Sequence, residues 1–158
     1  MHKLVAGSVC LVTFALMSCA HSGSTETGTA SAGATASPSG KSLYDRLGGM
    51  DAIKAVVDDF INSTAADPKV NKFFAHTDAA HLKGQISEML CQATGGPCKY
   101  TGMSMKDAHA GRKIASGDFD VVAGHLVDTL NKLKVPEQEQ KDLLAIVAPL
   151  KSDIVAQQ

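Results

Sequence analysis

His109 stands near the end of a stretch that does not favour a long helix. Residues 95–113, GGPCKYTGMSMKDAHAGRK, begin with two glycines and a proline and lie between segments with a helical pattern. Glycine and proline interrupt helices, so we expect His109 to lie on one or two helical turns that tertiary contacts hold in place. Its imidazole is then either a ligand for a bound group or a structural side chain.

A metal site built from His76, His81 and His109 is an alternative that the spacing does not favour. The pattern His-x-x-x-His, which places two imidazoles on one helix face, is absent, and His76 and His81 are spaced by five residues. No Ser/His/Asp motif, glycine-rich phosphate loop or carboxylate pair indicates hydrolytic or nucleotide chemistry.

Cys91 and Cys98 bracket the sequence QATGGP, which predicts a turn between them. In an oxidising compartment two such cysteines are disulfide candidates, and closing so short a loop stabilises a fold by about 2–3 kcal/mol in the chain-entropy model. Two free thiols are the alternative. The spacing is not Cys-x-x-Cys and no second pair follows, so a zinc site is disfavoured.

The N-terminus is typical of an exported protein. A short cationic start precedes an apolar run over residues 4–17, which is too short to span a bilayer comfortably and predicts a signal peptide at 1–18. The sequence LMSC at 16–19 resembles a bacterial lipobox, in which Cys19 would be acylated; ordinary signal cleavage is the alternative. Ala20, in place of Asp, favours the outer membrane over the inner membrane.

Residues 19–41 are predicted to form a lipidated cysteine and a tether. The segment 21–40 is almost entirely Ser, Thr, Gly and Ala, which cannot bury enough apolar surface to fold. A flexible chain of about 20 residues reaches roughly 25 Å. We therefore expect the domain at 42–158 to stand on the periplasmic side of the outer membrane, attached through the N-terminal lipid only.

The predicted domain is all-α. Apolar residues recur with the helical period and none of the long segments alternates like a strand. Pro68 should end the first helix, and the second should begin at a Thr77 or Asp78 cap and stop at Gly95 and Gly96. Asp118 is a plausible cap for the third helix, and Pro149 should kink the fourth. A net charge of −1 and a pI of about 6.6 exclude a basic nucleic-acid surface, and no apolar stripe remains for self-association, which favours a monomer. The four helical segments are 50–68, 77–96, 117–135 and 136–155.

Several ordered motifs resemble the group I truncated haemoglobins over residues 42–155. The resemblance implies a shortened globin fold, two helices crossed over two, around haem b. It further implies reversible binding of O₂, NO or CO, and some family members oxidise NO to nitrate with an electron donor, here an unknown reductase. The motifs are SLYDRLGG, DDF followed by KFFAHTD, HLKG, GGP.KYTG..M...H.GR, VAGHLVDTL and APL.

The same resemblance implies roles for individual residues. His109 matches the proximal iron ligand, with the opposite face of the haem left open for a gas. Phe74 matches the phenylalanine that packs on the haem face, and Arg112 is the first candidate to meet a haem propionate. Residues expected to wall the pocket or to contact the propionates more weakly are Phe60, Phe73, Leu82, Ile86, Leu90, Tyr100, Met103, Met105 and Lys106.

The distal side departs from the family pattern. Ile61 stands where many members have a tyrosine, and Leu82 and Ile86 are expected to face the iron, so O₂ would lack a hydrogen bond worth about 1–3 kcal/mol. Gln85 and His81 are the nearest polar candidates, and His81 or His76 is an alternative sixth ligand, although the helical phase favours the surface for both histidines.

A function of another class stays open from the sequence. A cofactor-free helical lipoprotein acting as an envelope interaction module would have the same helices, tether and anchor. It would be colourless and well folded without haem, whereas a globin would take up one haem per chain.

Overall fold

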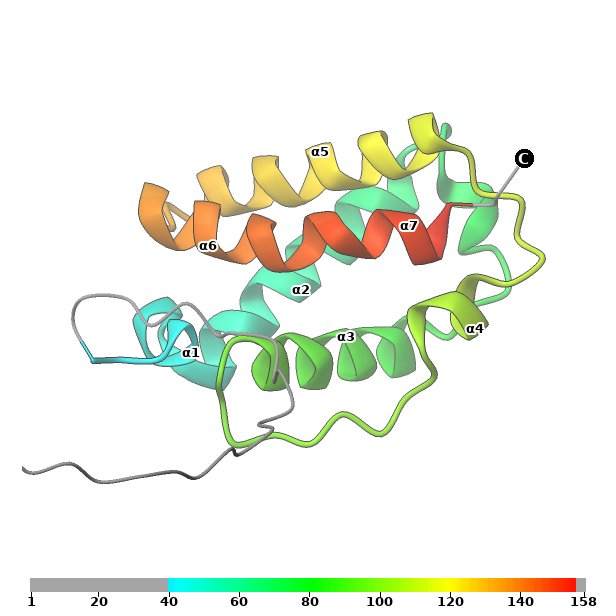
Figure 1. Cartoon of the computed structure of the whole chain (residues 1–158). Helices are drawn as coiled ribbons and strands as arrows, with labels where there is room; N and C mark the ends of the chain where they lie inside the picture. Colours follow the sequence, from blue (N-terminus) through cyan, green and yellow to red (C-terminus); the bar gives the residue numbers. More distant parts are fainter. Residues whose placement is uncertain (1–39, 156–158) are drawn as a thin grey trace, which may run out of the picture. The chain divides into compact units, whose positions relative to one another are not determined.

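The computed structural model describes residues 40–155, and within this range every regular element is helical (Figure 1). The predicted signal peptide, Cys19 and nearly all of the predicted tether lie outside the described residues. No helix within 40–155 is long and apolar enough to cross a membrane. The elements are α1 (Leu43–Leu47), α2 (Gly49–Ala66), η1 (Asn71–Phe73), α3 (Ala79–Ala93), α4 (Met105–His109), α5 (Ser116–Lys132), α6 (Glu137–Val147), η2 (Ala148–Leu150) and α7 (Lys151–Ile154).

The predicted boundaries of α2 and α3 are confirmed. α2 ends at Ala66 because Asp67 precedes Pro68 and takes an extended conformation that a helix does not allow. Asp78 caps α3 by accepting hydrogen bonds from the backbone N–H groups of Ala80 and His81 at 2.8 and 3.1 Å. Local sequence signals therefore determine where α2 ends and where α3 begins.

The second half of the domain contains one confirmed and one wrong prediction. Pro149 lacks a backbone N–H and interrupts the fourth helix, which divides into α6, η2 and α7 as expected. Asp118 is not the cap of α5. It lies in the first turn, and its carboxylate accepts a hydrogen bond from the Ala115 N–H at 3.0 Å, so the helix begins at Ser116.

α1 is a short helix that the periodicity did not predict. Ser42 caps it by accepting a hydrogen bond from the Asp45 N–H at 3.1 Å, and Gly48 ends it with a positive φ of 101°. Arg46 then joins α1 to α6 through ion pairs with Glu139, at 2.8 Å, and Asp142. These half-buried pairs raise the pKa of Arg46 above its ordinary value, mainly through the hydrogen bond to Asp142.

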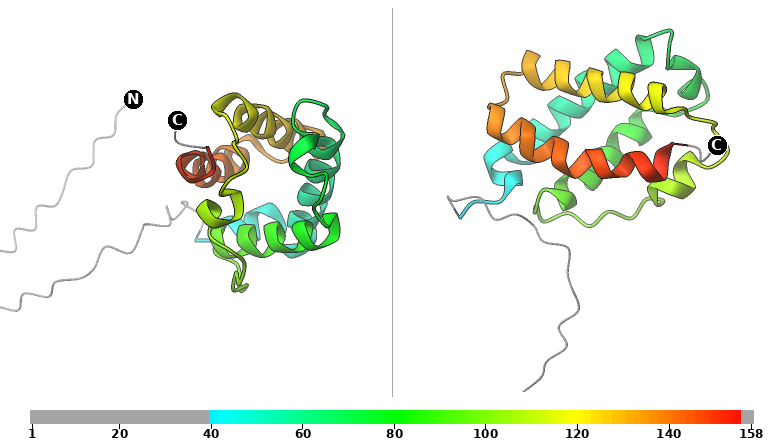
Figure 2. Two further views of the ribbon diagram at one scale, coloured as in Figure 1. Left: turned by 90° about the vertical axis from the view of Figure 1, so that its right-hand side faces the viewer. Right: turned by 45° about the horizontal axis from the view of Figure 1, so that its top comes forward.

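The helices form two crossed layers, as expected. α5 runs beside α6 and α7 in one layer, while α3 lies in the other and α2 packs against both α3 and α5 (Figures 1 and 2). α4 follows α3 after a long extended segment and packs against α7. This order places α4, which ends at His109, between α7 and the layer that contains α3 (Figure 1).

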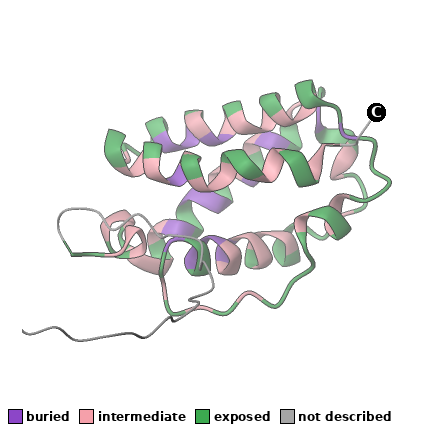
Figure 3. Cartoon of the chain, in the orientation of Figure 1, coloured by how far each residue is buried: buried purple, intermediate pink, exposed green. Residues whose placement is uncertain are grey.

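Most buried apolar side chains form a cluster away from α4; Val70, before η1, and Ile114, after α4, are buried outside that cluster. α1, α4 and α7 contain no buried residue, whereas α2, α3, α5 and α6 all do (Figure 3). We call the region around the largest buried cluster the core end, and the region of η1, α4, α7 and the first half of α3 the α4 end. The core-end cluster is Ile53, Val56, Val57, Ile61, Leu90, Cys91, Leu126, Leu130 and Leu143.

Candidate functional site

The His109 side chain is held in one orientation by its own helical turn. Ser104 caps α4 by accepting a hydrogen bond from the Asp107 N–H at 3.1 Å, and α4 ends at His109. The His109 Nδ1 lies 2.8 Å from the Met105 carbonyl oxygen. A carbonyl can only accept, so Nδ1 carries a proton, and in the neutral imidazole the lone pair is then on Nε2. Nε2 hydrogen-bonds to no other residue in the range 40–155.

The apolar side chains of the α4 end are only half-buried. Leu82 and Ile86 lie one turn apart on α3 and touch the edge of the core cluster without entering it. Phe60, Phe74 and Met105 have the same intermediate exposure. Aromatic and aliphatic side chains normally contribute most when fully buried, so this end contains apolar surface that its own helices do not cover.

Arg112 connects the turn after α4 to the corner before α3. Its Nε donates to the Ala108 carbonyl oxygen and its Nη1 to the Phe73 carbonyl oxygen, both at 3.0 Å. A pocket of about 240 Å³ lies beside this link, and the basic side chains around it form no ion pair with another described residue. The pocket is lined by Lys72, Phe73, His76, Thr77 and Arg112.

Two residues expected to line the haem pocket lie elsewhere. Met103 is 64% exposed because the extended segment before α4 directs it to solvent, so that expectation is wrong. Leu90 is 5% exposed within the core cluster, where it lines a different pocket.

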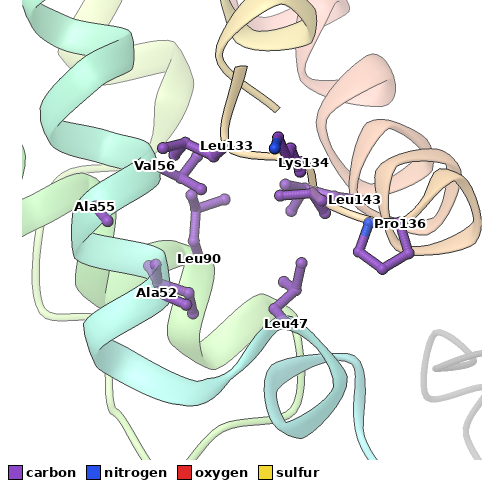
Figure 4. Close-up of a pocket in the computed structure, with 11 residues that line it drawn as sticks. Leu47, Ala52, Ala55, Val56, Leu90, Leu133, Lys134, Pro136 and Leu143 are labelled. Carbon is purple, nitrogen blue, oxygen red and sulfur yellow. The ribbon is translucent and has the colours of Figure 1, made fainter. Parts of the chain in front are cut away.

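The pocket that Leu90 lines is at the core end. It has a volume of about 290 Å³ and lies between α1, α2, α3 and the connection from α5 to α6 (Figure 4). Its lining is apolar apart from Lys134, and no histidine takes part. The lining residues are Leu47, Ala52, Ile53, Ala55, Val56, Leu90, Leu133, Lys134, Val135, Pro136 and Leu143.

The predicted distal residues are placed in different environments. Ile61 is 2% exposed and belongs to the core cluster. Gln85 has a buried Oε1 with no hydrogen-bond partner in the described part of the chain, and this atom lies against Gly102 together with the Tyr100 ring. The Tyr100 hydroxyl donates to the Met103 carbonyl oxygen at 2.8 Å. Gln85 is therefore directed toward the segment before α4.

The other histidines do not form a metal site with His109. His76 and His81 are exposed, and no three His, Cys, Asp or Glu side chains among residues 40–155 are grouped to hold a metal ion. This finding removes the support for a site built from His76, His81 and His109.

His125 has a partner that the sequence did not indicate. Its Nε2 lies 2.9 Å from the Asp67 carboxylate, so the middle of α5 is joined to the end of α2. The pKa of Asp67 lies below its ordinary value because the Lys69 N–H and then the His125 imidazole hydrogen-bond to the carboxylate. The two residues are 58 positions apart, so no local signal could have paired them.

Cys91 and Cys98 form a disulfide at the end of α3, with Cα atoms 5.7 Å apart. The bond closes the turn that leads into the extended segment before α4. Both cysteines contact the core cluster, and Cys91 is fully buried within it.

Comparisons with known proteins cover the whole helical domain. The model of the bacterial-like globin family matches residues 42–156. The group 1 truncated haemoglobin of Mycolicibacterium paratuberculosis is 42% identical over 113 residues, which is 72% of this chain and 83% of that protein. A truncated haemoglobin from Tetrahymena pyriformis, in the Fe(III) form, superposes with a TM-score of 0.70 at 31% identity and covers 74% of this chain and 100% of that one. The 2/2 haemoglobin of Synechococcus sp. PCC 7002, solved with covalently attached haem, gives 0.69 at 32% identity, with 73% and 98% covered.

Proposed function

Because the chain belongs to the bacterial-like globin family, among the group 1 truncated haemoglobins, we propose that it binds haem b and reversibly binds a diatomic gas at the iron. O₂, NO and CO are the candidate gases. Haem supplies an iron with an open coordination position and accessible redox states. The chain must supply an axial ligand, apolar walls and groups for the haem carboxylates.

The observation that carries the proposal is the state of His109. Its Nδ1–H donates to the Met105 carbonyl oxygen, so in the tautomer able to bind a metal the Nε2 lone pair has no hydrogen-bond partner among residues 40–155. Metal-ligating histidines are commonly held in this way, because the second hydrogen bond fixes both the tautomer and the ring orientation. The imidazole also lies at the end of the domain whose apolar side chains are incompletely covered.

The surrounding residues fit a flat apolar group with two acidic substituents. Phe60, Phe74, Leu82, Ile86 and Met105 offer apolar surface of intermediate exposure. His109 would bind the haem iron, and those five side chains would form the walls of the site. Arg112, with Tyr100, would meet the carboxylates; the Arg112 Nη2 hydrogen-bonds to no residue of the described range.

The distal residues favour gases that need no hydrogen bond. Ile61, Leu82 and Ile86 have no donor group, and Gln85 is turned toward Gly102. O₂ becomes partly negative on binding iron, so the missing donor lowers its affinity by about 5- to 150-fold, which corresponds to 1–3 kcal/mol. CO is less sensitive to such a donor. Oxidation of NO to nitrate with a reductase stays a prediction from the resemblance, since it requires O₂ to be retained.

We also propose the export route predicted from the sequence. The segment LMSC at 16–19 supports lipidation at Cys19, and the Ser/Thr/Gly/Ala segment supports a tether that holds a monomeric domain on the periplasmic side of the outer membrane. Mass spectrometry of the N-terminus would test it: an acylated Cys19 is expected, and an unmodified cleaved terminus would contradict it.

Titration of the protein with haemin, followed by reduction and exposure to CO and then air, tests the haem proposal. We expect one haem per chain, a five-coordinate ferrous spectrum and CO binding. A six-coordinate ferrous spectrum would contradict the open distal side and indicate His81 or His76 as an internal ligand. No saturable uptake by a folded protein would contradict the globin function and favour the interaction-module alternative.

A further inference from the structure

The segment between α3 and α4 runs back along α3. α3 ends at Ala93, and the chain turns at Gly95 and Gly96 and then extends to Ser104 before α4 begins (Figure 1). Gly96 has to be a glycine, because a Cβ there would lie 2.7 Å from the Cys91 sulfur and 2.5 Å from the Tyr44 ring. The tight turn therefore depends on this position and sends the chain toward the His109 site.

A disulfide and a hydrogen bond attach this segment to α3. The first is the disulfide between Cys98 and the fully buried Cys91. The second is a hydrogen bond of 2.7 Å from the Tyr100 N–H to the Gln92 side-chain oxygen. Gly102 then lies directly against the side chain of Gln85, two turns before Gln92 on α3. The contact between the segment and α3 therefore continues toward α4.

α4 has little means of holding its own position. It has five residues, none of them buried, and a helix of this length is not stable alone in water. Contacts with the rest of the domain hold α4 in place. They are its packing against α7, the hydrogen bond from Arg112 to the Phe73 carbonyl oxygen, and the preceding segment that is attached to α3. The segment is the support that connects α4 to α3, which forms the opposite wall of the proposed haem site.

We propose that the Cys91–Cys98 disulfide positions His109 by fixing the length of free chain between α3 and α4. The inference rests on the proposed haem function. With the disulfide intact, residues 99–104 connect the covalent crosslink to α4; without it, residues 94–104 connect the end of α3 to α4, and the Tyr100–Gln92 hydrogen bond remains. Cys91 and Cys98 are thus positioning residues, since neither offers a group to the haem iron or to the gas.

The test compares the haem-loaded wild-type protein with Cys98→Ala, Gln92→Ala and the double variant. Cys98→Ala opens the crosslink and leaves Cys91 as a small apolar side chain in the core. Haem loss to excess apomyoglobin should be about threefold faster, because the free connection roughly doubles in length. Gln92→Ala should have a smaller effect. In the double variant, haem loss should accelerate by more than the product of the two single-variant factors, because the disulfide and the hydrogen bond hold the same segment.

A matched control separates positioning from general destabilisation. Val135→Ala trims a half-buried side chain that contacts the core cluster far from α4, and its loss of stability to urea is measured beside that of Cys98→Ala. Haem loss from Val135→Ala should stay at the wild-type rate. The iron–histidine stretching band of the reduced protein should shift or broaden in Cys98→Ala only.

The outcomes distinguish this inference from the haem proposal. Equal haem-loss rates and identical iron–histidine bands in wild type and Cys98→Ala would overturn the positioning role while leaving haem binding intact. The same holds if Val135→Ala and Cys98→Ala accelerate haem loss equally at equal loss of stability. No haem uptake by the wild-type protein would overturn both.

Discussion

The core end and the α4 end contain the same kinds of apolar side chain but bury them to different degrees. Leu130 and Leu143 at the core end are 0% and 2% exposed, whereas Leu82 and Ile86 on α3 remain half-buried. At the core end four helices pack against one another and the Arg46 ion pairs hold α1 in place. At the α4 end, a five-residue helix and extended connections stand in place of long packed helices.

This difference indicates which part of the fold depends on a ligand. Each Å² of apolar surface left in water forgoes about 25 cal/mol, so half-buried phenylalanine, leucine and isoleucine side chains are a cost unless something covers them. A ligand that binds only the folded state adds stability according to its affinity and concentration. The core end should therefore fold without haem, and the α4 end should gain most of its order and stability when haem binds.

The largest effect is expected at the iron ligand. His109→Ala removes the imidazole that the Met105 carbonyl oxygen orients, so stoichiometric haem uptake and the five-coordinate ferrous spectrum should both be lost. Haemin titration followed by absorbance measures this directly. His76→Ala changes an exposed histidine and is the control, with uptake unchanged. Retention of the wild-type spectrum by His109→Ala would refute the ligand assignment.

A second pair of variants compares the two ends. Leu143→Ala empties a fully buried site and should reduce the free energy of unfolding by about 2–5 kcal/mol with or without haem. Ile86→Ala should have a smaller effect on the haem-free protein, because its side chain is already partly in water, and a larger effect once haem is bound. Urea unfolding followed by circular dichroism, with and without haemin, gives the change in the free energy of unfolding for each variant in each state. Equal effects of Ile86→Ala in both states would remove the distinction between the two ends.

A gain of function at the same position tests the distal side. Ile86→Gln places an amide donor where the wild-type chain has only apolar atoms, so O₂ affinity should rise by about 5- to 150-fold. CO affinity should change much less, because bound CO carries little negative charge. The ratio of the two affinities, from flash photolysis and stopped-flow mixing, is the measurement. An unchanged ratio would mean that residue 86 does not face the gas.

The helices were predictable because their signals are local. The apolar period, the Asp78 cap and the break at Pro149 each act over a few residues, and all three appear in the structure. The position of His109 on a single short turn also followed from the surrounding glycines and proline. Such local signals are sufficient where the residues of one helix determine where that helix begins and ends.

The contacts that orient the site were not predictable, because their partners are distant or belong to the backbone. His109 and Arg112 donate hydrogen bonds to the backbone carbonyl oxygens of Met105 and Phe73. Every residue type has such a carbonyl, so the sequence does not indicate which one accepts. Met103 was misplaced because its segment is extended and fastened to α3, a geometry that depends on contacts rather than on period. The His125–Asp67 pair joins helices from opposite halves of the chain.

The smallest expected effect concerns that pair, which holds the corner leading to Phe73 and Phe74. The pKa of Asp67 is lowered from its ordinary value of 3.8, so its contribution to stability is complete above that value and is lost as the pH falls through the lowered pKa. Asp67→Asn should therefore be less stable than wild type at pH 7, and the two should converge as the pH falls below about 3.8. Urea unfolding at pH 7, 5 and 3 measures the difference.

Asp128→Asn, on the exposed side of α5, serves as the control for this comparison and should match wild type at pH 7. A constant gap between Asp67→Asn and wild type at all three pH values would show that the carboxylate acts through shape and not through its charge. Because the pair lies between α5 and the end of α2, its loss should also loosen η1, and haem dissociation from Asp67→Asn should then accelerate slightly at pH 7. The α4 end should respond more than the core end, because the core cluster shares no residue with the pair.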